Sequence, residues 1–164
     1  MKVKVEIKSK VAVLNDVLKK ISGMECLVGI PAGKASRDTG AKINNATIGY
    51  INEFGSERMH IPARPHLVPG VKKAHSKISD IMAKSLKKEL ELKGSSDFKK
   101  TLSACGLVAS ASVKTMLQEG LKPALAPSTI KQRARQTKGD HSGDIPLINT
   151  GNYMNHITYV VKKK

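Results

Sequence analysis

The side chains that could do chemistry in this chain are few, and their spacing does not suit catalysis. Cys26 with a histidine could form a nucleophile pair, but a small buried core residue is the better interpretation of that cysteine. Glu89 and Glu91 lie on a lysine-rich helical segment and not across a cleft. No Gly-x-Ser-x-Gly nucleophile turn occurs. The sequence therefore predicts no catalytic residues and a protein that is not an enzyme.

The sequence also predicts no cofactor and no metal ion. His60 and His66 flank a proline-rich segment at a spacing that zinc ligands do not use. Three glycines of the first third of the chain lack the spacing and the Lys-Ser/Thr pair of a phosphate-binding loop: Gly33, Gly40 and Gly49. Cys26 and Cys105 stand in unrelated contexts, which indicates neither a disulfide framework nor a metal ribbon. A reducing cytoplasm is the expected surrounding of two such cysteines.

One pair of charged residues carries a clearer structural signal. Glu53 falls in the last turn of a predicted helix, where its charge faces the negative end of the helix dipole at a cost of about 0.3–1 kcal/mol. Arg64 stands between Pro62 and Pro65, which stiffen the backbone around it. We expect a bidentate Glu53–Arg64 pair that pins the loop to the helix end. The alternative is two solvated charges that do not interact.

The segment 45–67 must position this pair. Asn45 is expected to cap a short helix with its side chain. Three apolar residues share one face of that helix: Ile48, Ile51 and Phe54. Gly55 follows where a residue with positive φ usually ends a helix. The proline segment then returns as an extended loop that we expect to contact a neighbouring subunit.

Two parts of the chain carry a family resemblance. Ile-Asn-Glu-Phe-Gly at 51–55, followed by Ile-Pro-Ala-Arg-Pro-His-Leu at 61–67, resembles the signature of tail-completion and head–tail joining proteins of long-tailed bacteriophages. The segment 146–161 resembles the closing pattern of that family, which is Pro-Leu, an apolar residue, Asp-Thr-Gly, a short turn, Ser-Ile and an alternating strand. Here Asn149 replaces the Asp and His156 replaces the Ser, so a polar group is kept at both positions. The Val-Gly-Ile-Pro run that starts at residue 28 also fits.

The resemblance implies a structural virion protein of the phage neck that completes the tail and joins it to the head. It implies self-assembly into a ring, a hexamer or another high-order homo-oligomer. The neighbours would be the tail tube or terminator and the head connector proteins, with phage DNA in the lumen and no membrane. Such a protein is assembled in the host cytoplasm. The residues expected at subunit contacts or in the structural motif are Glu53, Phe54, Gly55, Pro62, Arg64, Pro65, Thr150 and Gly151. A tail terminator or a head–tail connector adaptor is the nearest alternative.

The charge of the chain supports an alternative of another class, a small basic nucleic-acid-binding protein. The net charge is +16, with 29 Lys and Arg against 13 Asp and Glu. Candidate DNA contacts lie on a short basic helix at 129–135 and on the C-terminal tail: Lys131, Arg133, Arg135, Lys162, Lys163 and Lys164. A solvated face is the other interpretation of these residues. Aromatic residues are scarce and no helix-turn-helix, zinc finger or RNA-recognition signature occurs.

The remaining pattern predicts an α+β fold in a single domain, 1–164. Lys and Val alternate over residues 2–8, which is typical of a half-buried strand, and an amphipathic helix is expected over 10–22. Residues 26–30 read as a second, buried strand, and the chain ends in a strand through Ile157, Tyr159 and Val161. We expect a small antiparallel sheet that includes the N- and C-terminal strands and packs against helices.

Two further segments complete the predicted domain. Residues 31–44 are expected to form a loop, and residues 69–119 a helical insertion. Apolar stripes on both halves of that insertion, and small residues on its second half, favour a hairpin of two helices. Residues 162–164 form a basic tail. No apolar stretch approaches the roughly 20 residues that a membrane-spanning helix requires, and the N-terminus lacks the apolar core of a secretory signal.

Overall fold

The computed structural model describes residues 2–36, 43–91, 97–136, 144–149 and 151–164, with only the backbone described for residues 2–10 and 136. Within these ranges the α-helices are α1 (Lys2–Ser22), α2 (Asn45–Phe54), α3 (Leu67–Lys73), α4 (His75–Glu91), α5 (Phe98–Gln118), α6 (Pro127–Gln136) and α7 (Asn152–His156). Two 3-10 turns, η1 (Ala32–Lys34) and η2 (Glu57–Met59), and two strands, β1 (Met24–Gly29) and β2 (Thr158–Lys163), complete the elements. The mixture of helices with a small antiparallel sheet confirms the predicted α+β class.

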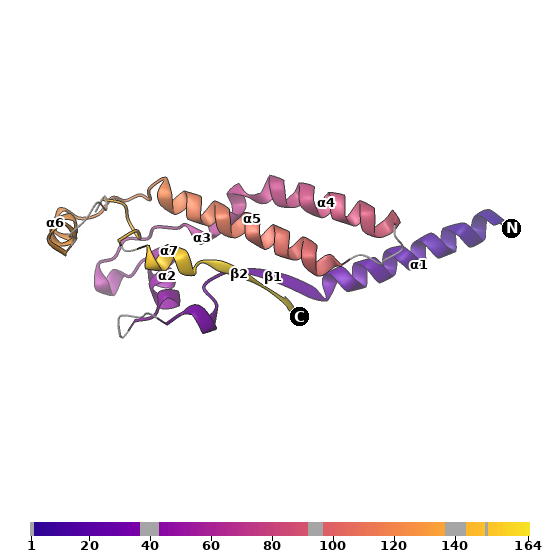
Figure 1. Cartoon of the computed structure of the whole chain (residues 1–164), viewed down its shortest axis with the longest axis horizontal. Helices are drawn as coiled ribbons and strands as arrows, with labels where there is room; N and C mark the ends of the chain where they lie inside the picture. Colours follow the sequence, from indigo (N-terminus) through magenta and orange to yellow (C-terminus); the bar gives the residue numbers. More distant parts are fainter. Residues whose placement is uncertain (1, 37–42, 92–96, 137–143, 150) are drawn as a thin grey trace.

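Helix α5 is the centre of the molecule. It packs against α3 and α4 on one side and against β1 and β2 on the other, and α4 and α5 run side by side as the predicted hairpin (Figure 1). Asp97 caps α5 by accepting a hydrogen bond from the backbone N–H of Lys99 at 3.2 Å, as expected for an aspartate in this place. The largest buried residues of α5 form one stripe: Phe98, Leu102, Cys105, Ala109, Val113 and Leu117.

The sheet joins the early part of the chain to its end. Strands β1 and β2 pair antiparallel, with Cys26 opposite Val161 and Leu27 opposite Val160. Leu27 and Val160 are exposed on the outer face. On the inner face the Tyr159 ring and the Cys26 sulfur lie so close to Gly106 of α5 that a Cβ there would come within 2.7 Å of both. The glycine therefore permits the sheet to lie directly on the helix.

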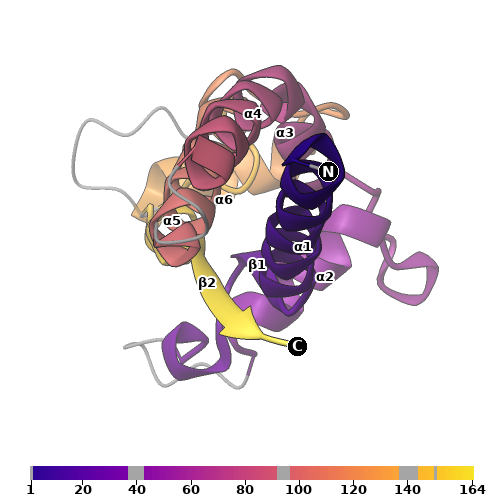
Figure 2. The same cartoon turned by 90° about the vertical axis from the view of Figure 1, so that its right-hand side faces the viewer.

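The predicted strand at residues 2–8 is wrong, because these residues form the first turns of α1. That helix continues through the predicted helix at 10–22, and its N-terminal part extends beyond the end of the α4–α5 hairpin (Figures 1 and 2). A helix satisfies its backbone hydrogen bonds locally, whereas a strand needs a partner. In the described part of the chain the sheet has two strands only, so the sheet contains the strand at 24–29 in place of the N-terminal segment. Lysine and glutamate between the valines are also good helix formers.

The helical insertion begins earlier than predicted and contains a break. Helix α3 starts at Leu67, so Pro69 lies in its first turn, where a missing N–H is tolerated. The pattern that predicted one long helix is divided at Ala74 between α3 and α4. Of the expected loop at 31–44, residues 32–34 form η1, and residues 37–42 lie outside the described residues. Among the helices that the structure describes, none is long and apolar enough to cross a membrane.

Candidate functional site

Glu53 lies at the contact between α2 and the start of α3. Its Oε2 accepts hydrogen bonds from the backbone N–H groups of His66 at 2.7 Å and Leu67 at 2.9 Å, and its Oε1 accepts from that of Val68 at 3.1 Å. The side chain is buried. Glu53 therefore caps α3 from a distance of thirteen residues along the chain, a role that local sequence rules assign to the residue just before a helix.

The predicted Glu53–Arg64 ion pair is therefore wrong. The charge of Glu53 does need an offset at the end of α2, but the positive end of α3 supplies it through three amide groups. Burial alone would raise the pKa of Glu53, yet the hydrogen bonds from the backbone N–H groups of His66, Leu67 and Val68 lower it overall. The carboxylate stays ionised and holds the proline segment to the helix, as the pair was expected to do.

Arg64 points instead towards a different loop. Its Nε donates to the carbonyl oxygen of Pro123 at 2.7 Å, and its Nη2 donates to that of Ala124 at 2.9 Å. Its backbone N–H donates to the carbonyl oxygen of Asn52 at 2.6 Å. The side chain is 7% exposed, so this arginine is an internal anchor and is not a projecting contact residue.

His66 is fully buried and connects the two motif segments. Its Nδ1 lies 2.9 Å from the carbonyl oxygen of Arg64 and 3.2 Å from Glu53 Oε2. Because both oxygens are acceptors, Nδ1 carries the proton, and Nε2 accepts a hydrogen bond from the Tyr153 hydroxyl at 2.5 Å. Burial lowers the pKa of His66, which keeps the ring neutral. Burial and the nearby charge of Glu53 raise the pKa of Tyr153, which keeps its hydroxyl a donor.

A second link joins the same segments. Asn45 is fully buried, and its Nδ2 donates to Asn152 Oδ1 at 2.9 Å. Its predicted role as the cap of α2 is wrong, because Asn44 does this by accepting from the N–H of Thr47 at 2.8 Å. We call Asn45, Glu53, Arg64, His66, Asn152 and Tyr153 the polar cluster. Through it the segment 45–67 and the closing segment 146–161 meet as one unit.

Several residues of the polar cluster were not predicted. The closing pattern predicts a short turn at Asn152 and Tyr153, and the sequence offers His66 only as a possible metal ligand. One signal could have identified His66. Residues two apart in an extended segment point to the same side, so Arg64 and His66 should share a face, and both are buried.

The other predicted contact residues lie around the polar cluster. Phe54 is 66% exposed, and its ring contacts the equally exposed ring of Tyr50, with centroids 4.9 Å apart. Pro62 and Pro65 are exposed. Gly55 ends α2 with φ of 79°, as predicted, and a Cβ there would lie 2.9 Å from the backbone nitrogen of Ala63.

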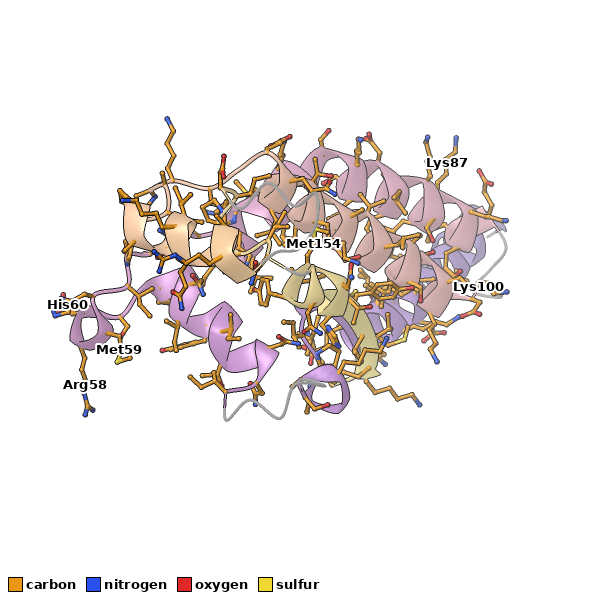
Figure 3. The ribbon with its side chains drawn as sticks, turned by 60° about the vertical axis from the view of Figure 1, so that its left-hand side comes forward. Arg58, Met59, His60, Lys87, Lys100 and Met154 are labelled. Atoms are coloured by element: carbon orange, nitrogen blue, oxygen red, sulfur yellow. The ribbon has the colours of Figure 1, made fainter. Side chains whose placement is uncertain are left out.

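Two elements complete the surroundings of the polar cluster. Gly151 precedes α7 with φ of 73°, and Thr150 lies outside the described residues. The turn η2 projects from the body of the molecule, with Arg58, Met59 and His60 at its tip (Figure 3).

The six candidate DNA contacts do not form one surface. Lys131 and Arg135 are exposed on α6, which lies at one end of the molecule, whereas β2 ends near its middle (Figure 1). Arg133 turns inward, and its Nη1 donates to the carbonyl oxygens of Ile145 at 3.0 Å and Ile148 at 2.9 Å.

The basic tail is partly engaged by the fold itself. Lys162 pairs with Glu25 at 3.1 Å, and Lys163 and Lys164 are exposed. The backbone N–H of Lys164 donates to the carbonyl oxygen of Gly23. These lysines therefore extend the strand pairing, and only part of their positive charge is available to an outside partner.

Cys26 and Glu89, the candidate chemical residues of the sequence, have structural surroundings. Burial, and then the neighbouring Cys105, raise the pKa of Cys26, which disfavours a reactive thiolate. Glu89 is fully buried and accepts a hydrogen bond from Lys20 at 3.0 Å, which ties α4 to α1. Within the described ranges no group of three or more His, Cys, Asp or Glu side chains could hold a metal ion.

Comparisons of the chain with protein-family models, curated proteins and solved structures found no match.

Proposed function

We propose that this protein is a structural component of the neck of a long-tailed bacteriophage, where it completes the tail and joins it to the head as a subunit of an oligomeric ring. The observation that carries the proposal is the polar cluster. The two segments that resemble the phage family are about 80 residues apart in the chain, yet His66 and Tyr153 join them by a buried hydrogen bond. Two parts of one family pattern are expected to pack together in the fold, and this contact supports the proposal.

The surface held by the polar cluster suits contact between subunits. The buried Glu53 stands next to the exposed Phe54, whose ring packs on Tyr50. Beside them, an open concave surface runs along the proline loop from Phe54 to Ala63. Aromatic side chains are common anchors in protein interfaces because they bury a large area at a small entropic cost. We therefore assign subunit contact to Tyr50 and Phe54 and a positioning role to Glu53 and Arg64.

This function requires no catalysis and no cofactor, since shape and subunit contact would do the work. The partners would be further copies of the chain, the tail tube or terminator, and the head connector, in a virion assembled in the host cytoplasm. A tail terminator or a connector adaptor would use the same surface. The basic charge is the argument for a free nucleic-acid-binding protein. The inward direction of Arg133 and the Lys162–Glu25 pair reduce the charge available for that role.

Deletion of the gene from its phage tests the proposal. We expect filled heads and separate tails that fail to join, and electron microscopy of particles from complementing phage should place the protein between head and tail. Normal joined virions from the deletion would refute the neck assignment.

Complementation with variants tests the assigned contact surface. The double variant Tyr50→Ser, Phe54→Ser should fold but fail to restore joining. The matched control is Leu107→Ser, which removes another exposed apolar side chain, 61% exposed, from α5. Full complementation by the double variant would show that the aromatic pair is not a subunit contact.

A further inference from the structure

A polar pocket of about 300 Å³ lies beside the polar cluster. Its walls come from α2, α6, α7 and the two loops that Arg64 and Arg133 hold. The polar side chains that line it are Arg64, Arg133, Asn52, Asn149, Asn152 and Tyr153. None of its described lining residues is acidic. We call it the arginine pocket.

Arg64 is the unusual residue of this pocket. It is 7% exposed, and its two side-chain hydrogen bonds go to the neutral carbonyl groups of Pro123 and Ala124. A guanidinium group has five N–H donors, so most of its donor capacity is left for another acceptor. Among the described residues no carboxylate lies within ion-pair distance of Arg64, although charges this deeply buried are normally paired.

Arg133 brings a second positive charge to the same place. Its Nη1 is held by the carbonyl oxygens of Ile145 and Ile148, which fixes the guanidinium at the pocket wall. Arg64 and Arg133 line the same pocket. Burial, and then the charge of Arg64, lower the pKa of Arg133. Two arginines retain their charge at all physiological pH values. An anion between them would be attracted by both, and the asparagine side chains can add neutral donors.

We propose that the arginine pocket binds a small oxyanion, a phosphate or a carboxylate, between Arg64 and Arg133. The planar donor fork of arginine matches the oxygens of either group. Two sources can supply this chemistry, a free phosphate ion or an acidic side chain of a second copy of the chain. The pocket would bind an oxyanion whether or not the protein works in a phage neck.

The test uses the full chain, with inorganic phosphate as the probe and chloride at matched ionic strength as the reference. We expect phosphate to raise the melting temperature saturably and chloride to have no comparable effect. Asn149→Asp places a carboxylate at the edge of the pocket. This variant should melt at a higher temperature in chloride and bind phosphate at least about tenfold more weakly, which by the usual conversion is about 1.4 kcal/mol. Arg135→Gln removes an exposed charge from the same helix outside the pocket lining and should respond to phosphate as the wild type does.

Two results would overturn the proposal. One is equal stabilisation of the wild type by phosphate and chloride. The other is an equal loss of the phosphate response in Arg135→Gln and Asn149→Asp, which would indicate a general effect of net charge. Light scattering across protein concentration distinguishes the two sources. Phosphate binding that does not depend on protein concentration indicates a free ion, whereas phosphate that competes with self-association indicates an acidic side chain of a second copy.

Discussion

At the scale of single residues, the main result is that neighbouring motif residues have opposite roles. Glu53 is buried and accepts three backbone hydrogen bonds, whereas Phe54 beside it is exposed. A helix places consecutive residues about 100° apart, so one can point to the core and the next to solvent. The resemblance treats both as one motif, but the structure separates a residue that stabilises the fold from one that is available for contact.

Removal of the Glu53 carboxylate should destabilise the protein strongly. Glu53→Ala leaves the first amide groups of α3 without their acceptor, and hydrogen bonds to a charged group contribute about 1.5–3 kcal/mol each at most sites. We expect the free energy of unfolding, measured by urea titration, to fall by at least about 2 kcal/mol. The control is Glu57→Ala, which removes an exposed carboxylate from η2 and should change stability by less than about 0.5 kcal/mol. Similar losses in both variants would contradict the capping role.

Acid should destabilise the protein through His66. The pKa of the buried ring lies below its ordinary value of 6.5, so below that pH the unfolded state binds a proton that the folded state does not. The contribution of His66 is therefore fully present above about pH 6.5 and is lost as the pH falls below it. The lowered pKa of Glu53 adds a further loss of stability below its ordinary value of 4.5.

Unfolding titrations from pH 8 to pH 5 should show declining stability, with a smaller decline in His66→Gln. An unchanged decline in that variant, or the same effect in the exposed His60→Gln, would assign the proton to another group.

At the scale of elements, α5 organises the fold because the sheet approaches it closely on one side and α3 approaches it closely on another. A Cβ at Gly106 would lie 2.5 Å from the ring of Tyr159, and one at Gly70 of α3 would lie 2.8 Å from the Cα of Val113. Small residues at these points let the strand and the helix approach the backbone of their neighbour. The small-residue side of α5, which indicated helix–helix contact in the sequence, serves the sheet at Gly106.

Gly106→Val should separate the sheet from α5. Overpacking a core typically costs about 1–3 kcal/mol, which exceeds the less than about 1 kcal/mol that a helix gains on losing a glycine. We expect a lower midpoint of urea unfolding and weaker hydrogen-exchange protection in β1 and β2. Gly33→Val is the matched control, because no atom lies within 4 Å of a Cβ there and its φ is not in the left-handed region. Unchanged protection of the strands in Gly106→Val would show that the sheet does not depend on this contact.

At the scale of the whole molecule, exposed charged and apolar side chains of the described residues lie on separate parts of the fold. The exposed basic residues of α6 lie at one end, and α1 extends from the other (Figure 1). Residues 11–18 of α1 also leave three apolar side chains exposed: Val11, Leu14 and Leu18. A protein that meets its partners in an assembled ring can distribute its contacts in this way, because the ring and not a single surface holds the parts together.

Binding of the isolated chain to duplex DNA should be weak and independent of sequence. The net charge of +16 attracts phosphates, but Arg133 and Lys162 are engaged within the fold. We expect binding in fluorescence anisotropy at low salt that is lost near physiological salt, because a few phosphate contacts give little affinity at the start and salt weakens each of them. Lys131→Gln with Arg135→Gln should reduce the salt dependence further. Sub-micromolar affinity at physiological salt would favour the nucleic-acid-binding alternative over the neck assignment.

The sequence by itself determined the elements whose signals are local. The helix at 98–118, its aspartate cap, the glycine end of α2, the final strand and the α+β class follow from periodicity, capping and turn chemistry, which act over a few residues. The tertiary structure decided the partners of the charged and polar groups. Glu53 binds the backbone amides of α3 and not Arg64. Arg64 donates hydrogen bonds to the loop at 123–124, and His66 accepts one from Tyr153. The hydrogen-bond partner of each group depends on which other polar groups are buried beside it, away from water. The packing of the whole chain decides this. The N-terminal segment shows the same limit, because an alternating pattern can indicate a strand but only the sheet decides whether there is a partner for it.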